Sequence, residues 1–366
     1  MMKPFKIADM HCDTVMHLWY SRLRKSPLHL LDTSASDHPL QIDLKKLLKG
    51  NYVLQNFAMF TDLSLPEGFN GVSEASNYLQ VTNEKDGRMD PWFQVCEMIR
   101  VFQEEMAENA DLIRQVRNWD DIRSNMEAGR ISALLTVEEG AAIQEDLDRI
   151  HTLFDAGVRM MTLTWNFENE LGYPNLNSSE MDTDFRSFFR FSPEPEKGLK
   201  QKGFEALEIM SQLGILTDVS HLSDAGFYDV AKTVKGPFVA SHSNARALTG
   251  CARNLTDDMI RIIGQHGGVI GLNFCPCFVM EADREDLCTC SIEGLCRHAR
   301  HIMNVGGSQV LGLGTDFDGI DPVGLEIEDA GKMQKLAEGF LHNGFTETQV
   351  DGILSQNVLR LYREVL

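Results

Sequence analysis

The 366-residue chain lacks any uninterrupted apolar run of about 18 residues, which excludes a transmembrane helix. Its N-terminal MMKPFKIADMHCD lacks the apolar core and cleavage site of a secretory signal, and its C-terminal NVLRLYREVL lacks a lipid-anchor tail. Basic residues are scarce: 34 Lys and Arg stand against 54 Asp and Glu, and a net charge of −20 disfavours nucleic-acid binding. Because 43% hydrophobic and 24% charged residues are typical of a globular protein, we expect an acidic, soluble, cytoplasmic protein with no membrane or nucleic-acid partner.

Short apolar runs alternate with amphipathic stretches along the chain, without a repeat of fixed period or a low-complexity tract. The runs expected to form strands are residues 6–10, 52–60, 131–137, 159–164, 215–219, 237–240, 269–274 and 310–314. The stretches expected to form helices are residues 92–107, 146–156, 203–213, 224–233, 256–265, 292–304, 328–342 and 346–365. Near-continuous apolar runs such as RMMTLTW are typical of parallel strands buried on both faces.

Eight strands that alternate with helices predict an α/β fold, a single (β/α)8 TIM-like barrel. A doubly wound open sheet is the alternative, but no G-x-G-x-x-G sequence opens a helix after the first strand. We expect one domain over residues 1–366, including two C-terminal helices at about 328–365. The long segments 66–91 and 166–202 follow the second and fourth strands, so we expect them to enclose a substrate, with surface elaboration as the alternative.

Five of the eight cysteines lie between Cys275 and Cys296, as CPC, CTC and Cys296 itself. C-x-C pairs lack the C-x2-C spacing of structural zinc sites, and disulfides are rare in a reducing cytosol. We therefore expect ordinary buried or loop thiols, with a second metal site as the alternative.

Ionisable residues gather where the expected strands end. Five of the eight strands deliver a histidine or a carboxylate there: His11 and Asp13, Glu138 and Glu139, Asp218 and His221, His242, and Asp316. A barrel brings these strand ends to one mouth, where so many acids and imidazoles are costly unless a cation or a tight network neutralises them. Histidine and carboxylate ligands are of the kind that hold zinc, and a carboxylate between two ligand groups can bridge a two-metal site.

Five motifs together resemble those of the membrane (renal-type) dipeptidase family, peptidase family M19. They are HxD on the first strand, VE-x-G on the third, D-x-x-H-x-S on the fifth, SHS with an arginine eleven residues after its histidine, and G-x-DFDG on the eighth. The resemblance spans nearly the whole chain, from Ile7 to the NVLRL near its end, and is to cytoplasmic bacterial-type members. It implies a metal-dependent hydrolase of the TIM-barrel type with two zinc ions per chain, other divalent metals being the alternative.

The resemblance also implies a role for each matching residue. His11 and Asp13 would bind one zinc ion and His221 and His242 the other, with Glu138 bridging both. Glu138 is preferred to Glu139 because it directly follows Val137, as in the VE-x-G pattern. Asp316 would activate the bridging water and later protonate the leaving amine.

Arg253 would grip the substrate carboxylate, since a planar guanidinium suits bidentate recognition. The alternative for Arg253 is a surface salt bridge. One position departs from the renal pattern LTH: the chain reads Leu163-Thr164-Trp165, and an indole donates one N–H but cannot act as an imidazolium. Losing such a donor costs about 10²–10³ in turnover unless Asn166, Asn169 or a zinc ion replaces it.

The first hypothesis is therefore a zinc-dependent dipeptidase acting on a small dipeptide through a metal-bridging hydroxide, with Asp316 as proton shuttle. A related dinuclear-zinc amidohydrolase acting on N-acyl amino acids or lactams is the second. A catalytically reduced metal-binding barrel is the third. A homodimer is the default expectation for a soluble barrel.

Overall fold

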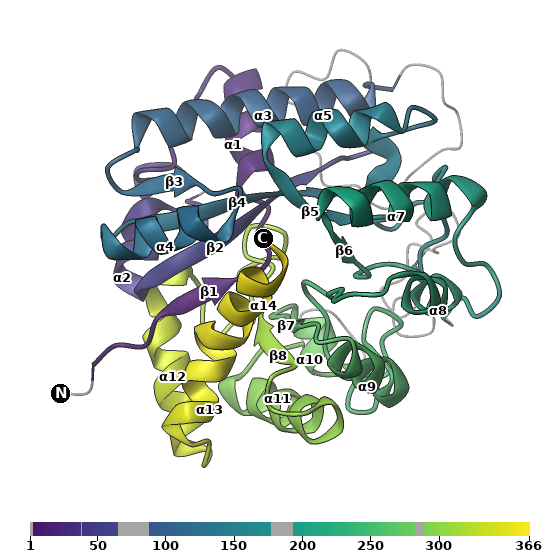
Figure 1. Ribbon diagram of the computed structural model, residues 1–366. Helices are drawn as coiled ribbons and strands as arrows, with labels where there is room; N and C mark the ends of the chain where they lie inside the picture. The colour runs from purple at the N-terminus through teal and green to yellow at the C-terminus, as the bar shows by residue number, and fades with distance from the viewer. Residues whose placement is uncertain (1–2, 38, 65–87, 177–192, 283–287) are drawn as a thin grey trace.

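The protein is described by a computed structural model that covers every residue except 1–2, 38, 65–87, 177–192 and 283–287 (Figure 1). The strands are β1 (Ile7–Asp9), β2 (Tyr52–Phe60), β3 (Ile113–Gln115), β4 (Ile131–Glu138), β5 (Val158–Thr162), β6 (Leu216–Asp218), β7 (Ile270–Leu272) and β8 (Leu311–Leu313). The helices are α1 (Thr14–Leu23), α2 (Leu44–Gly50), α3 (Pro91–Glu108), α4 (Trp119–Glu127), α5 (Asp148–Ala156), α7 (Gln201–Leu213), α8 (Asp224–Thr233), α9 (Asp257–Gln265), α10 (Pro276–Val279), α11 (Ile292–Gly306), α12 (Met333–His342), α13 (Glu347–Asp351) and α14 (Asn357–Val365). Short 3-10 turns, η1 (Gly140–Ala142) and η3 (Ala330–Lys332), and a π-helical turn, η4 (Gly352–Gln356), complete them.

The strands form one curled, parallel sheet, and this confirms the predicted α/β barrel-type fold. Neighbouring strands follow the order β6-β5-β4-β2-β1-β8-β7, and β3 pairs with the first half of β4. The two ends of the sheet are linked by residues 237–240, where Val239 bridges to Asp218 and Ala240 to Ile270. Helices surround the sheet on its outer side (Figure 1).

Several details differ from the sequence prediction. The expected strand at 237–240 forms only these isolated bridges. The short strand β3 was not predicted, because its three residues include the exposed Arg114 and show no apolar run. The helices α1, α2, α4 and α10 were also not predicted. Thr256 caps α9, accepting a hydrogen bond from the Met259 N–H at 3.3 Å.

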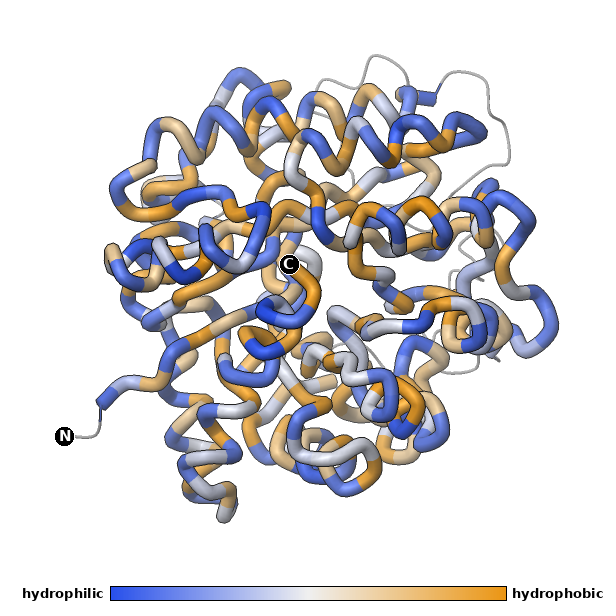
Figure 2. Tube along the Cα trace, viewed as in Figure 1, coloured by the Kyte–Doolittle hydropathy of each residue, from blue (hydrophilic) through white to orange (hydrophobic). Residues whose placement is uncertain are grey.

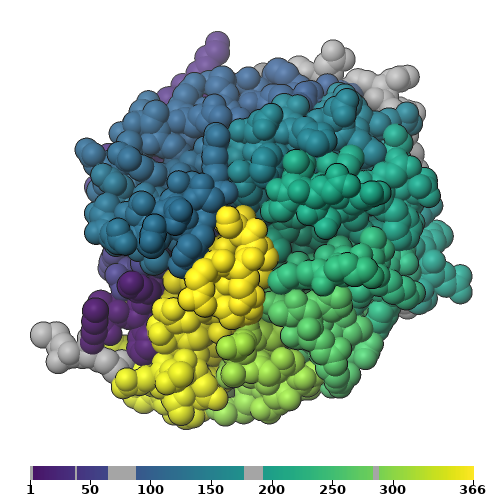
Figure 3. All heavy atoms as spheres, in the orientation of Figure 1, coloured from purple at the N-terminus to yellow at the C-terminus, as the bar shows by residue number. Residues whose placement is uncertain are grey.

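The C-terminal helix closes one end of the barrel. Val358, Leu361 and Tyr362 of α14 belong to a buried cluster with Met10 and Leu54. The Tyr362 hydroxyl accepts a hydrogen bond from the Asn56 amide at 2.6 Å. In Figure 3, α14 lies across the middle of the visible face, and Figure 2 shows hydrophobic stretches along the strands around it. Because this end is filled with side chains, a site for a ligand belongs at the opposite end, where the strands finish.

Of the two long segments expected to enclose a substrate, residues 66–87 and 177–192 lie outside the described residues. Within the described ranges, none of the helices combines the length and hydrophobicity needed to cross a bilayer.

Candidate metal centre

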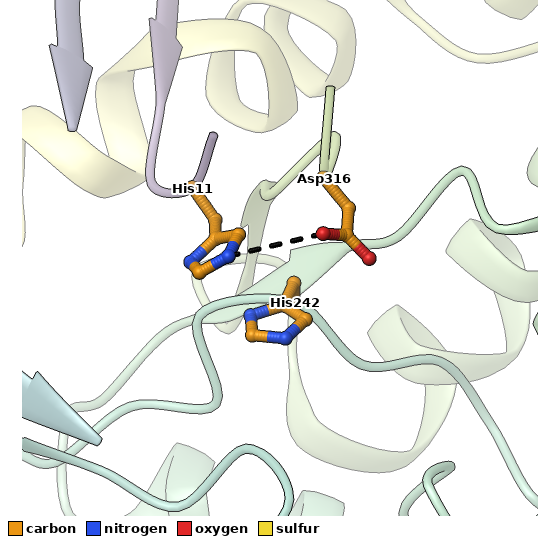
Figure 4. A group of neighbouring side chains, drawn as sticks. All are labelled: His11, His242 and Asp316. Carbon is orange, nitrogen blue, oxygen red and sulfur yellow. Dashed lines mark ion pairs between the residues drawn. The ribbon is translucent and has the colours of Figure 1, made fainter. Parts of the chain in front are cut away.

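The strand ends bring together the six residues that the sequence singled out as metal ligands or proton carrier. Five of them are buried and Asp316 is partly buried, and their ligand atoms form three overlapping triads: His11, Asp13 and Glu138; Glu138, His221 and His242; and His11, His242 and Asp316. All atoms within each triad lie within 4.8 Å of one another. Figure 4 shows the third triad, in which the imidazole rings of His11 and His242 stack at 3.8 Å beside Asp316.

Glu138, the last residue of β4, lies between two sets of ligands. Its Oε1 is 3.1 Å from His221 Nε2 and 3.5 Å from His242 Nε2. Its Oε2 is 3.4 Å from His11 Nε2, and that same nitrogen is 3.5 Å from Asp13 Oδ2. The two carboxylate oxygens therefore face opposite sides, which is the geometry of a bridging ligand.

His221 and His242 are held with their Nε2 atoms toward Glu138. His221 Nδ1 lies 2.8 Å from Asn166 Oδ1, an acceptor, so Nδ1 carries the proton. His242 Nδ1 lies 2.8 Å from the Ser241 hydroxyl, which in turn donates to Asp218 at 2.5 Å. Hydrogen bonds of this kind at the outer nitrogen are typical of metal-ligating histidines.

This arrangement fits a cation. The Nε2 atoms of His221 and His242 are only 2.9 Å apart, and if both point lone pairs at Glu138, nothing but a proton or a cation relieves their repulsion. On the other side of Glu138, both ring nitrogens of His11 and the Oδ1 of Asp13 are buried without a hydrogen-bond partner. Buried polar atoms without partners are rare and call for a ligand. The donor set of imidazole and carboxylate suits zinc.

Burial sets the charge states of the site before any cation binds. It lowers the pKa of His221 and of His242 well below the ordinary value, so both rings are neutral, as metal ligands must be. Burial also raises the pKa of Glu138. At His11, burial acts to lower the pKa, but the Glu138 and Asp13 carboxylates outweigh it and raise the pKa above its usual range.

Asp316 faces His11 from the turn after β8. Its Oδ1 is 3.8 Å from His11 Nε2, and its Oδ2 accepts a hydrogen bond from the Asn273 amide at 3.0 Å. One oxygen is thus held while the other faces the cluster. Burial raises the pKa of Asp316 to about 6.

Arg253 is buried beside the cluster, which rules out the surface salt bridge considered as its alternative. Its guanidinium makes only long contacts, 3.5 Å to Ser243 Oγ and 3.4 Å to the His242 carbonyl, and lies over the Phe278 ring at 5.4 Å. Its Nε has no partner. Among the described residues, no carboxylate forms an ion pair with this buried cation, which leaves it able to bind an anion.

Glu139 has a different role from Glu138. Its carboxylate accepts hydrogen bonds from the backbone N–H groups of Ala141 and Trp165, each at 2.8 Å, and from the Asn169 amide. Glu139 therefore fixes the loop after β5 and does not face the metal ligands. Because Asn169 also donates to the Leu163 carbonyl at 2.8 Å, its amide is not available to a substrate.

The sequence analysis did not predict which residues orient the ligands, namely Asn166 as the partner of His221, Asp218 and Ser241 behind His242, and Asn273 behind Asp316. All are buried polar residues at or just after strand ends, and this is the one signal in the sequence that could have indicated them.

The cysteines form no disulfide, in agreement with the expectation of ordinary thiols. Cys251, Cys277 and Cys288 pack with Phe278 in a small apolar cluster, against which Cys275 also packs. A second metal site there stays a prediction.

The fold and the paired clusters define a class: a parallel α/β barrel with buried histidine and carboxylate clusters, suited to a metal, at the carboxyl ends of its strands. Over residues 1–366 the chain matches the membrane dipeptidase family, peptidase family M19, and it belongs to that family. It is therefore a metallopeptidase-family enzyme, a hydrolase of peptide bonds, as the motifs predicted.

Relatives of known sequence and structure agree with this assignment. The chain is 28% identical over 366 residues to an uncharacterized dipeptidase of Schizosaccharomyces pombe, covering 99% of this chain and 81% of that protein. It is 29% identical over 276 residues, 75% of this chain and 97% of the relative, to an uncharacterized protein encoded in the pqqA 5′ region of Klebsiella pneumoniae. A Rhodobacter sphaeroides metallopeptidase, liganded with a phosphinate mimic of L-Ala-D-Ala, has the same fold, with a TM-score of 0.81 at 22% identity over 100% of both chains. A crystal structure of an M19 dipeptidase also matches, with a TM-score of 0.80 at 24% identity over 99% of both chains.

Proposed function

We propose that the protein is a zinc-dependent dipeptidase with two zinc ions per chain. The observation that carries this proposal is the division of the Glu138 carboxylate between two sets of buried ligands. His11, Asp13 and Glu138 Oε2 would hold one ion, and His221, His242 and Glu138 Oε1 the other. When bound, two such cations polarise a carbonyl and acidify a water molecule.

Asp316 is the proton carrier in this proposal. Asn273 holds its Oδ2, so its Oδ1 is directed to the region between His11 and His242, where the scissile bond would lie. Asp316 accepts the proton of the attacking water and returns it to the leaving amine. Since a carboxyl group with a pKa near 6 can both take and give a proton at neutral pH, burial suits Asp316 to both steps.

Arg253 would select dipeptides by binding their free C-terminal carboxylate. It is a buried cation without an anionic partner among the described residues, and two parallel N–H donors match a carboxylate. The dipeptide mimic bound to the Rhodobacter sphaeroides relative and the name of the Schizosaccharomyces pombe relative support a dipeptide substrate.

The test is hydrolysis of L-Ala-L-Ala and L-Ala-D-Ala by zinc-loaded protein, with metal content measured in the same samples. Glu138→Gln should lose both bound zinc and turnover, because an amide cannot bridge two cations. Glu105→Gln is the matched control: Glu105 is also fully buried but pairs with Arg22, far from the cluster, so zinc content and turnover per folded molecule should stay.

Full turnover by a metal-quantified Glu138→Gln protein would overturn the bridging role. If zinc is bound but neither dipeptide is cleaved, while an N-acetyl amino acid or a lactam is, the second hypothesis replaces the first.

A further inference from the structure

Three aromatic rings form a shelf beside the metal centre. Trp165 contacts Phe60 edge-on at a centroid distance of 4.9 Å and Phe167 at 5.1 Å. Phe60 and Phe167 are buried, whereas Trp165 is only half-buried. The aromatic shelf, Phe60, Trp165 and Phe167, therefore presents its exposed member on a rigid apolar base.

The shelf is fixed in place next to a metal ligand. The Trp165 ring lies 5.8 Å from the His221 ring, and the next residue, Asn166, holds His221 Nδ1. The Trp165 backbone N–H donates to Glu139, the neighbour of Glu138, at 2.8 Å. A substrate whose carbonyl lies at Glu138 and His221 is thus within reach of the indole.

The shelf and Arg253 belong to different strand ends of the barrel, and His221 lies near both. Phe60 ends β2 and Trp165 follows β5, on either side of β4, which ends in Glu138. Arg253 follows the segment 237–240, which closes the ring of strands between β6 and β7. A dipeptide with its carboxylate at Arg253 and its scissile carbonyl at Glu138 therefore directs its N-terminal residue toward the shelf.

We propose that the aromatic shelf is the subsite for the N-terminal side chain of the substrate, so that the enzyme prefers dipeptides whose N-terminal residue is apolar. This inference rests on the proposed dipeptidase function. The indole offers an apolar face and no charge, so it favours leucine or phenylalanine over glycine or aspartate at that position.

The size of the preference follows from the burial of apolar groups. One methylene in a hydrophobic site changes kcat/KM by roughly 10–200-fold, and an open shelf belongs at the low end because solvent reaches one side. We expect kcat/KM for Leu-Ala to exceed that for Gly-Ala by about 10–100-fold. In Trp165→Ala this ratio should fall about tenfold, while Gly-Ala, which does not reach the shelf, changes little. Trp165→Phe should retain most of the ratio because it keeps an aromatic face.

Trp119→Ala is the matched control. Trp119 is also half-buried, but it packs against the buried cluster that includes Tyr362 and Leu359 of α14, at the opposite end of the barrel, so its loss should leave the ratio unchanged. A wild-type ratio near one would overturn the proposal. So would an equal loss of Leu-Ala and Gly-Ala hydrolysis in Trp165→Ala, because Trp165 would then only position His221.

Binding of uncleavable reduced-amide analogues, measured by calorimetry with zinc-loaded protein, separates this inference from the dipeptidase proposal. Tighter binding of the Leu-Ala analogue than of the Gly-Ala analogue, lost in Trp165→Ala, supports the shelf even if turnover is absent. Equal binding of the two analogues overturns the shelf even if both dipeptides are cleaved.

Discussion

Two arginines of one loop should respond in opposite ways to the same substitution. Arg253 is buried with no anionic partner, whereas Arg246 donates to both oxygens of Asp224, at 2.7 and 2.8 Å, and to the Ala252 carbonyl at 2.9 Å. Methionine has a similar length and no charge. In Arg253→Met the cost of burying an unpaired guanidinium disappears, so we expect the free energy of unfolding to stay constant or rise by about 1 kcal/mol. In Arg246→Met a partly buried pair is broken, and we expect a loss of about 2 kcal/mol.

For kcat/KM the order should be the opposite: Arg253→Met, which costs no stability, should impair dipeptide hydrolysis more than Arg246→Met does. Removing a buried partner of a charged group costs about 2–5 kcal/mol, so Arg253→Met should lower kcat/KM for L-Ala-L-Ala about 30-fold or more. The C-terminal amide of the same dipeptide, which lacks the carboxylate charge, should lose much less. Arg246→Met should affect acid and amide alike. Urea unfolding and steady-state kinetics on the two substrates measure both quantities, and an equal loss on acid and amide in Arg253→Met, or its destabilisation by 2 kcal/mol, would refute the reasoning.

Three further outcomes follow from the site and its surroundings. Asn166→Ala should weaken zinc binding by about 10–100-fold, because the acceptor that orients His221 is lost; metal-buffer titration measures this, and unchanged affinity would exclude Asn166 as an orienting residue. Chelation should lower the unfolding temperature, since ions present at 100 times their Kd stabilise the fold by about 2.7 kcal/mol, and an unchanged temperature after complete metal removal would argue against a site formed only in the folded state. Burial lowers the pKa of His298 from 6.5 to about 4, so the unfolded chain binds a proton that the folded protein does not, and stability should fall as the pH drops from 6.5 to 4. The contribution is at most about 3 kcal/mol, and His298→Gln should flatten this part of the profile in urea unfolding at several pH values; an identical slope in the variant would contradict it.

The strand ends were predictable because an ionisable residue follows each apolar run that forms part of the site. An apolar run that stops at a histidine or a carboxylate indicates both a buried parallel strand and the end at which it emerges, and this placed Glu138 and His242 correctly relative to each other. The bridges at 237–240 and the strand β3 were not predictable in the same way. Each depends on how neighbouring strands curl, and a run of three or four residues carries too little periodicity to distinguish a strand from a bridge.

The partners of the ligands could not be derived from spacing. Asn166 and His221 are 55 residues apart, and Asn273 and Asp316 are 43 apart, so only the closed sheet brings them together. The same holds for Trp165. The sequence showed an indole where the renal pattern has histidine, but its contacts with Phe60 and Phe167 depend on the turns after β2 and β5.

Three residues just after strand ends adopt a strained backbone conformation that directs their side chains. Glu139, His221 and Asp316 have φ angles of 79°, 69° and 64°, a left-handed region where non-glycine residues cost about 1–3 kcal/mol each. Glycine would relieve the strain but remove the side chain. At Glu139 the strain turns its carboxylate away from that of Glu138, toward the backbone N–H groups of Ala141 and Trp165, and those hydrogen bonds offset part of the cost. Two adjacent glutamates thereby serve two purposes: one faces the metal ligands, and the other fixes the loop that carries the aromatic shelf and the partner of His221.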